Sequence, residues 1–192
     1  SEICPPDTPA RTIRARQAVG VILSGGPRSV SDAGAPRCDS AIFEMGTPVL
    51  GICYGMQLMA SALGGTVAPA SQREFGHALV EVSGHADAAA LFAGVPSSIR
   101  VWASHGDFVA APPPGFRIVA TSANAPVAGM TDPQRRLHGL LFHPEVVHTD
   151  HGLEILKNFA YGVCGCVGDW TMASFVDEAT ARIRATVGDG RV

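Results

Sequence analysis

V-L-G-I-C-Y-G-M-Q-L-M-A, residues 49–60, is the stretch of sequence that decides the fold. Its first residues, together with Pro48, form a short apolar run of the kind that makes a buried strand. Beyond Cys53 the apolar side chains recur at helical spacing as far as Gly64 and Gly65, which can supply the left-handed cap that ends a helix. The stretch therefore predicts a buried strand, a tight turn and a buried helix.

Cys53 occupies the turn between this strand and this helix. Gly51 and Gly55 flank it in a G-x-C-x-G pattern, the cysteine counterpart of a nucleophile elbow, and they allow the chain to turn sharply. The sulfur would then lie at the carboxyl edge of the sheet, facing the positive end of the helix dipole, where the backbone N–H of Tyr54 could donate to an oxyanion. The pattern predicts a catalytic thiol; a small, buried and inert cysteine is the alternative.

A second motif, His143-Pro144-Glu145, follows an apolar run at residues 137–142 that we interpret as another strand. Catalytic loops of open α/β sheets gather at such strand ends. His143 could act as base and acid, while Glu145 could accept the other imidazole N–H and fix the tautomer. Taken alone, a His and a Glu in a loop are usually just solvated, so this motif gains its meaning from Cys53.

A glycine turn, Ser24-Gly25-Gly26-Pro27, ends a third apolar run at residues 19–24. Its backbone N–H groups, that of Gly26 among them, could complete an oxyanion hole with Tyr54. An ordinary glycine turn is the alternative interpretation.

The rest of the chain alternates strands and helices, regularly in its first third and less so afterwards. Further strands are expected at residues 78–82, 99–102, 116–121 and 127–130. Helices are expected at residues 39–45, 86–92 and 152–161. The pattern predicts an α/β fold with an open, mostly parallel sheet and helices on both faces.

The end of the chain differs from the rest. Apolar side chains recur at i, i+3, i+4 spacing from residue 172 to residue 187, which predicts an amphipathic helix. The best candidate for a boundary lies at residues 164–170. We therefore expect a single domain over residues 1–163, followed by a linker and an amphipathic helix over residues 164–192.

Composition excludes several classes of protein. The 192 residues, 46% of them hydrophobic and 16% charged, suit one well-cored domain. A net charge of -3 without a Lys/Arg-rich block argues against nucleic acid, and no apolar run is long enough to span a bilayer. The five irregularly spaced cysteines predict reduced thiols, no metal site is expected, and a cytoplasmic location is the default expectation.

Four motifs, in this order, resemble those of the class I glutamine amidotransferases. They are I-L-S-G-G-P (residues 22–27), G-I-C-Y-G-M-Q (51–57), S-H-G-D (104–107) and F-H-P-E-V (142–146). Within that family, R-E-F-G (73–76) and G-D-W-T-M-x-S-F (168–175) resemble the GMP synthase branch. The resemblance covers nearly the whole chain.

The resemblance implies a flavodoxin-like fold and a Cys-His-Glu triad made of Cys53, His143 and Glu145. Such a domain hydrolyses glutamine through a cysteinyl thioester and supplies the ammonia for amination of XMP to GMP. The residues implied in substrate binding are Gln57, Ser104, His105, Gly106 and Asp107. The implied partner is an ATP-pyrophosphatase (synthetase) domain, which alone would use ATP and Mg; no cofactor is expected in these residues.

The chain departs from the family pattern at both ends. Family members begin with an additional strand and a D-F-G-S-Q-Y-like turn before the part that resembles residues 1–16, and they continue beyond Val192 into the synthetase domain. We therefore expect a sheet without its first strand. A cysteine-dependent γ-glutamyl hydrolase or peptidase, which shares the acyl chemistry, and a non-catalytic docking or regulatory domain are the alternative interpretations.

Overall fold

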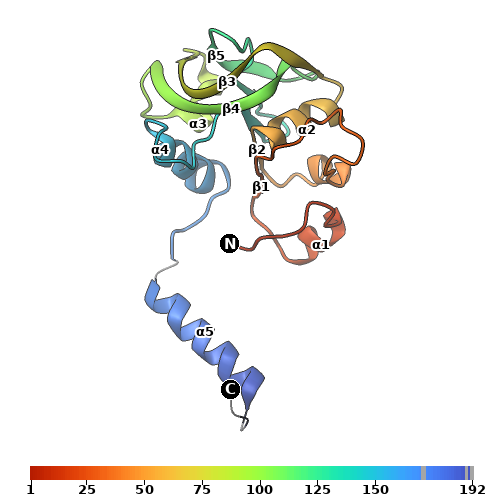
Figure 1. The fold of residues 1–192 in the computed structure, drawn as a ribbon. Helices are drawn as coiled ribbons and strands as arrows, with labels where there is room; N and C mark the ends of the chain where they lie inside the picture. Colours follow the sequence, from red (N-terminus) through yellow and green to blue (C-terminus); the bar gives the residue numbers. More distant parts are fainter. Residues whose placement is uncertain (170–171, 189, 191–192) are drawn as a thin grey trace.

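A computed structural model, which describes residues 1–169, 172–188 and 190, shows one seven-stranded sheet with helices around it (Figure 1). The strand order is β1-β2-β7-β6-β5-β3-β4. The strands are β1 Val21–Leu23, β2 Val49–Ile52, β3 Thr66–Val82, β4 Ser98–Ala111, β5 Arg117–Ser122, β6 Gly129–Asp132 and β7 Leu137–Leu140. Among the described residues, β1 pairs with β2 and lies at one end of this order.

The parallel part of the sheet consists of β1, β2 and β7. β2 lies between the other two, with Ile52 opposite Leu140. All four residues of β2 and of β7 are buried, as expected for strands that are covered on both faces. The carboxyl ends of β2 and β7 therefore meet at the same edge.

The remaining four pairings are antiparallel, so the expectation of a mostly parallel sheet is wrong, and the sheet is mixed. A parallel crossover needs a dozen or more residues. The connections at residues 123–128 and 133–136 are too short for that and return each chain segment beside the previous strand. β3 and β4 are also much longer than the apolar runs that predicted them, because their polar residues pair as well.

Helical segments cover both faces of the sheet, as expected, and several of them are shorter or tighter than predicted. They are α1 Ala10–Ala15, the 3-10 helix η1 Ser40–Glu44, α2 Tyr54–Ala62, the 3-10 helix η2 Ala86–Ala88, α3 Ala89–Phe92, α4 Gly152–Lys157, the π-helical η3 Asn158–Val163 and α5 Met172–Val187. α1, η1 and α2 pack on the face that bears Val49. α3, α4 and η3 pack on the face that bears Leu50. The two layers are visible on either side of the sheet in Figure 1.

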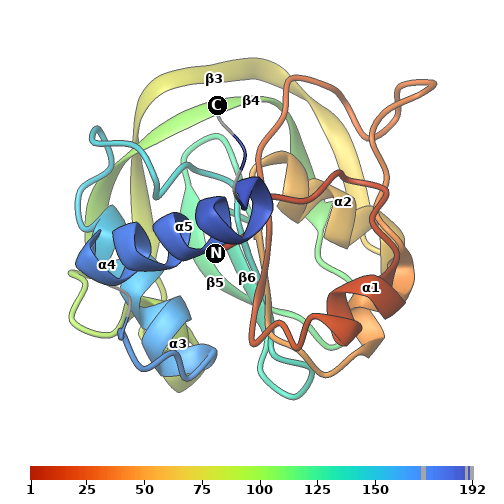
Figure 2. The ribbon, with the colours of Figure 1, turned by 90° about the horizontal axis from the view of Figure 1, so that it is seen from below.

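α5 lies apart from this body. Figure 1 shows it well below the sheet, and Figure 2, viewed from below, shows it crossing beneath the other elements. Its described apolar side chains Phe175, Val176 and Ile183 are exposed. The predicted helix is therefore present. Of the tail motif over residues 168–175, Trp170 and Thr171 lie outside the described residues.

Candidate functional site

Cys53 is held in a strained turn at the end of β2. Its backbone angles, φ 50° and ψ −106°, are unusual for a residue with a side chain. The neighbouring glycines are required by close approach, because a Cβ on Gly55 would lie 2.0 Å from the Leu23 carbonyl oxygen. A Cβ on Gly51 would lie 2.7 Å from the Gly55 backbone. The predicted elbow is therefore present, with α2 beginning at the next residue.

The surroundings of Cys53 fix both its main chain and its sulfur. Its N–H donates to the Leu140 carbonyl at 2.7 Å, which ties the elbow to β7. Cys53 Sγ lies 3.5 Å from the Ser104 carbonyl oxygen, which brings β4 against the sulfur. Cys53 is only 3% exposed, so the sulfur lies in a largely water-free setting.

His143 reaches Cys53 because it follows β7, the parallel neighbour of β2. Its Nδ1–H donates to Glu145 Oε1 at 2.7 Å, which leaves Nε2 for the sulfur. Hydrogen bonds first with Cys53 and then with Glu145 raise the pKa of His143 to about 10, although burial acts in the opposite direction. His143 is thus an imidazolium at neutral pH. Burial acts to raise the pKa of Glu145, but the His143 hydrogen bond, the Glu145 backbone N–H and the charge of His143 together lower it.

Thr149 holds the His143 loop onto β4. Its hydroxyl donates to the His143 carbonyl at 2.6 Å and accepts from the Trp102 N–H at 2.9 Å. The His143 N–H in turn donates to the Trp102 carbonyl at 3.0 Å. A threonine in a polar loop gives no sequence signal of such a role.

The predicted glycine turn after β1 lies directly against the two reacting side chains. A Cβ on Gly25 would be 2.8 Å from His143 Cε1 and 3.6 Å from Cys53 Cβ, so only glycine fits there without displacing the imidazole. Gly26 packs against the ring of Tyr54, where a Cβ would lie 3.6 Å away. Tyr54 is the first residue of α2, so its N–H has no acceptor within the helix.

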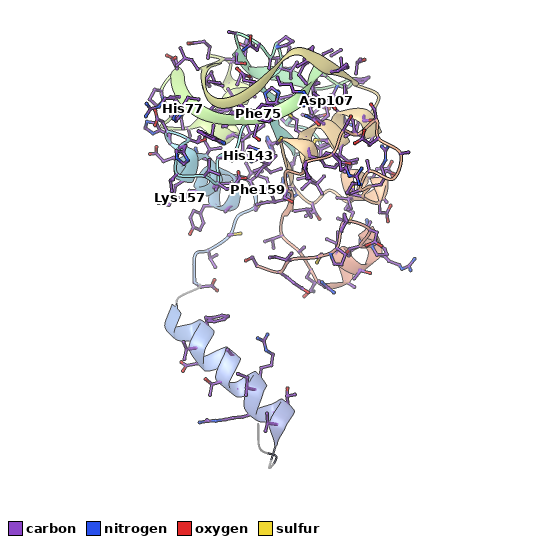
Figure 3. The ribbon with its side chains drawn as sticks, viewed as in Figure 1. Phe75, His77, Asp107, His143, Lys157 and Phe159 are labelled. Atoms are coloured by element: carbon purple, nitrogen blue, oxygen red, sulfur yellow. The ribbon has the colours of Figure 1, made fainter. Side chains whose placement is uncertain are left out.

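The predicted substrate-binding residues meet on the same side of the site, but two of their side chains are already engaged. Gln57 is buried and its Nε2 donates to the Asp107 carbonyl at 3.0 Å. The His105 ring is buried and its Nε2 lies 3.2 Å from Glu74 Oε2. In Figure 3, His143 lies beneath the β3–β4 ribbon and Asp107 lies farther along it, towards α2. Gly106, which has no side chain, can face a substrate only through its backbone.

Two absences hold for the part of the chain that the structure describes. In that part, no group of three or more His, Cys, Asp or Glu side chains could hold a metal ion. Nor does any helix there have the length and apolarity needed to cross a membrane.

Comparisons with known proteins agree with this geometry. The sequence profile of the family described as "Glutamine amidotransferase class-I" matches residues 1–163. The GMP synthase (glutamine-hydrolyzing) of Geobacillus kaustophilus is 53% identical over 192 residues, which are 100% of this chain and 37% of that protein. The corresponding protein of Parafrankia sp. is 51% identical over 100% of this chain and 35% of its own length. The chain thus spans little more than a third of these relatives.

Solved structures give the same result. A Thermoplasma acidophilum protein described as one subunit of GMP synthase superposes with a TM-score of 0.72 and 30% identity, over 93% of this chain and 84% of that one. A glutamine amidotransferase of Thermotoga maritima gives a TM-score of 0.59 at 24% identity, over 88% of this chain and 66% of that one, which is a likeness of fold alone.

Proposed function

The chain belongs to the class I glutamine amidotransferase family, and from this premise we propose that it hydrolyses glutamine to glutamate and ammonia. The observation that carries the proposal is the line of three groups at the ends of β2 and β7. His143 hydrogen-bonds Cys53 on one side and Glu145 on the other, the latter at 2.7 Å. This arrangement is that of a nucleophile, its acid–base partner and an orienting carboxylate.

Acylation begins with the thiol proton on His143 and the sulfur as thiolate. The sulfur attacks the carboxamide carbon, and the carbonyl electron pair moves to oxygen. Backbone N–H groups of Tyr54 and of the Gly25-Gly26 turn would donate to that oxyanion. As the oxyanion collapses, the C–N bond breaks, His143 gives its proton to the departing ammonia, and a γ-glutamyl thioester remains.

Deacylation uses the same residues in reverse. Neutral His143 takes a proton from water, and the resulting hydroxide attacks the thioester carbon. Collapse of the second tetrahedral species breaks the C–S bond and releases glutamate, and the sulfur leaves as a thiolate beside the imidazolium. Glu145 stabilises the cationic ring in both halves of the reaction.

The substrate wall would be the backbone of Ser104, Gly106 and Asp107, with Gln57 bracing it through the Asp107 carbonyl. This wall lies against the sulfur, because the Ser104 carbonyl contacts Cys53. A glutamine carries an amino group and a carboxylate that need several polar partners, and exposed main-chain donors and acceptors can supply them.

The ammonia would serve the amination of XMP to GMP. This part of the proposal is supported by the names of the relatives, which are GMP synthases. The partner would be an ATP-pyrophosphatase domain, which would hold ATP and Mg, and α5 would lie on the side of the chain that leads to it. We place the reaction in the cytoplasm, since the five cysteines are free, as suits a reducing compartment.

Glutamate release by the purified chain, alone and mixed with a synthetase partner supplied with ATP and XMP, tests the proposal. Cys53→Ala should lower the rate by at least about a thousandfold, because the residual rate lacks the covalent step. Cys166→Ala is the matched control and should keep the wild-type rate. If folded wild-type protein releases γ-glutamyl groups from peptides but not glutamate from glutamine, the hydrolase alternative holds; if it binds the partner without turnover, the docking alternative holds.

A further inference from the structure

The ladder between β3 and β4 is interrupted beside Cys53. Pro69 pairs with Asp107, and the next pair is Glu74 with His105. Residues 70–73 therefore bulge out opposite the single residue Gly106. Pro69 has no N–H to give to the ladder. Gly106 thus has no partner residue on β3, close to the place where β4 borders the sulfur.

A polar pair closes the ladder at the edge of this bulge. Glu74 and His105 lie directly opposite each other, so their side chains share the inner face of the sheet. His105 Nε2 lies 3.2 Å from Glu74 Oε2, and the two side chains are only 3% and 13% exposed, respectively. Asn124 Nδ2 donates to the other carboxylate oxygen, Oε1, at 3.1 Å. Asn124 therefore fixes the Glu74 carboxylate through one oxygen, and the other oxygen of that carboxylate fixes the His105 ring.

The surroundings of the pair are apolar, so burying these two polar side chains costs free energy. Ala78, Val101 and Ala103 line the same small cavity as Glu74 and His105. Burial lowers the pKa of His105, while Glu74 and the Asp107 backbone act in the opposite direction and His143 lowers the pKa further. The neutral ring donates Nε2–H to Glu74. Its buried Nδ1 has no hydrogen-bond partner among the described residues.

Stability alone does not account for such a pair. Replacing both partners of a buried hydrogen bond by apolar residues of the same shape is often nearly neutral or stabilising. What the pair does control is the backbone on either side of His105. The carbonyl oxygen of Ser104 lies 3.5 Å from Cys53 Sγ, and the carbonyl of Asp107 accepts from Gln57.

We propose that Glu74 is a positioning residue: through its hydrogen bond to His105 it fixes the backbone of residues 104–107 against the Cys53 sulfur, in place of the ladder bonds lost at the bulge. The inference rests on the proposed glutaminase function, because residues 104–107 are the wall of that substrate site. The pair does not touch the reacting atoms and acts through the main chain.

The test compares two reagents on the full chain. Iodoacetamide, with the adduct at Cys53 quantified by peptide mapping because the chain has five free cysteines, reports the reactivity of that thiol without the substrate wall. A diazoketone analogue of glutamine reports the thiol together with the wall. The double variant Glu74→Leu/His105→Leu removes both polar partners, so neither side chain leaves a buried polar atom without a hydrogen-bond partner. Its alkylation by the analogue should fall at least about tenfold, its alkylation by iodoacetamide should stay within about twofold, and its melting temperature should be equal or higher.

Three further variants sharpen the comparison. Glu74→Gln keeps an acceptor for His105 Nε2–H and should stay within about twofold of wild type with both reagents. Asn124→Ala removes only the outer anchor of Glu74 and should slow the analogue by about two- to threefold without endangering the fold. Glu81→Leu, on the same strand and bonded to Ser98 across the same ladder, is the matched control and should change neither rate.

The outcomes separate this inference from the function on which it rests. If the analogue alkylates Cys53 in wild type, and equally fast in the folded double variant and in Asn124→Ala, the positioning role is wrong and the function stands. If the double variant does not fold, a wild-type rate in Asn124→Ala is sufficient to reject the role. If folded wild type is not alkylated by the analogue at all, both proposals fail.

Discussion

At the scale of single residues, the site depends on a backbone conformation of Cys53 that residues with a side chain rarely adopt. A residue with a side chain at φ 50° and ψ −106° costs about 1–3 kcal/mol. The hydrogen bond from its N–H to Leu140 and the close contacts of Gly51 and Gly55 maintain the turn. The strain places the sulfur at the start of α2 and within reach of His143, which an unstrained turn would not do.

The pKa of His143 provides a direct test of its contact with the sulfur. In wild type, the imidazole proton signals observed by NMR should titrate near pH 10, because the cation has two acceptors. In Cys53→Ala the midpoint should move down towards the ordinary value near 6.5, since one acceptor is gone. The same midpoint in both proteins would contradict the contact.

The raised pKa of His143 makes the stability of the folded chain depend on pH. Because the folded pKa of His143 is raised, to about 10, above the unfolded value near 6.5, its contribution to folding is complete below that lower pH. The contribution is lost as the pH rises through about 10. Urea unfolding at pH 7 and pH 10 should therefore show a larger loss of stability in wild type than in His143→Gln.

Glu145 should contribute less to the rate of glutamine hydrolysis than its position in the triad suggests. Its side chain is 44% exposed, so water screens the charge it presents to His143. We expect Glu145→Gln to lower the rate of glutamine hydrolysis by about tenfold, well below the roughly 10⁴-fold effect of the corresponding change in a buried triad.

Glu154→Gln is the matched control for that substitution. Glu154 forms a similar pair with His151 Nδ1 in a nearby exposed segment, away from the sulfur. An equal loss of rate in both variants would show that Glu145 acts on the fold or on the net charge and not on His143.

The triad and the glycine turn could be predicted from sequence because each stands at the end of an apolar run. Thr149 and Glu74 could not, because their roles arise from contacts with strands far along the chain. Thr149 hydrogen-bonds Trp102, 47 residues away in the sequence. Glu74 pairs with His105 at a bulge that no local sequence pattern predicts. His105 was expected to bind substrate from its motif, yet its side chain is buried against Glu74.

At the scale of elements, the β2–α2 unit determines where the site lies. α2 packs so closely on β1 that Gly55 touches the Leu23 backbone, and this contact sets the direction of the helix below the sulfur. Strand–turn–helix was read correctly from residues 49–60. The antiparallel half of the sheet was not, because polar residues such as those in β3 pair as readily as apolar ones once their neighbours are in place.

Gly55→Ala tests the tight β2–α2 contact. The new Cβ would lie 2.0 Å from a backbone oxygen, which no side-chain movement can relieve. We expect a loss of at least about 3 kcal/mol in the free energy of unfolding measured in urea, at the upper end of overpacking effects. Gly84→Ala is the control, because no atom lies within 4 Å of its Cβ and its φ is not positive; it should be neutral or slightly stabilising. A wild-type midpoint for Gly55→Ala would contradict the packing.

At the scale of the whole molecule, the site is a product of the mixed sheet. The parallel half brings together the turn after β1, Cys53 after β2 and the loop after β7. The antiparallel half folds β4 back over them, so that Ser104 contacts the sulfur and Trp102 holds the His143 loop. Four segments far apart in the sequence therefore meet at one of the chain's five cysteines.

The most direct test of the central claim is to treat the folded chain with a diazoketone analogue of glutamine and map the adduct by peptide mass spectrometry. We expect a single adduct on Cys53, prevented by excess glutamine and absent in urea, with the other four cysteines unmodified. A folded sample that carries no adduct on Cys53, or that is labelled equally at several cysteines in the presence of glutamine, would contradict it.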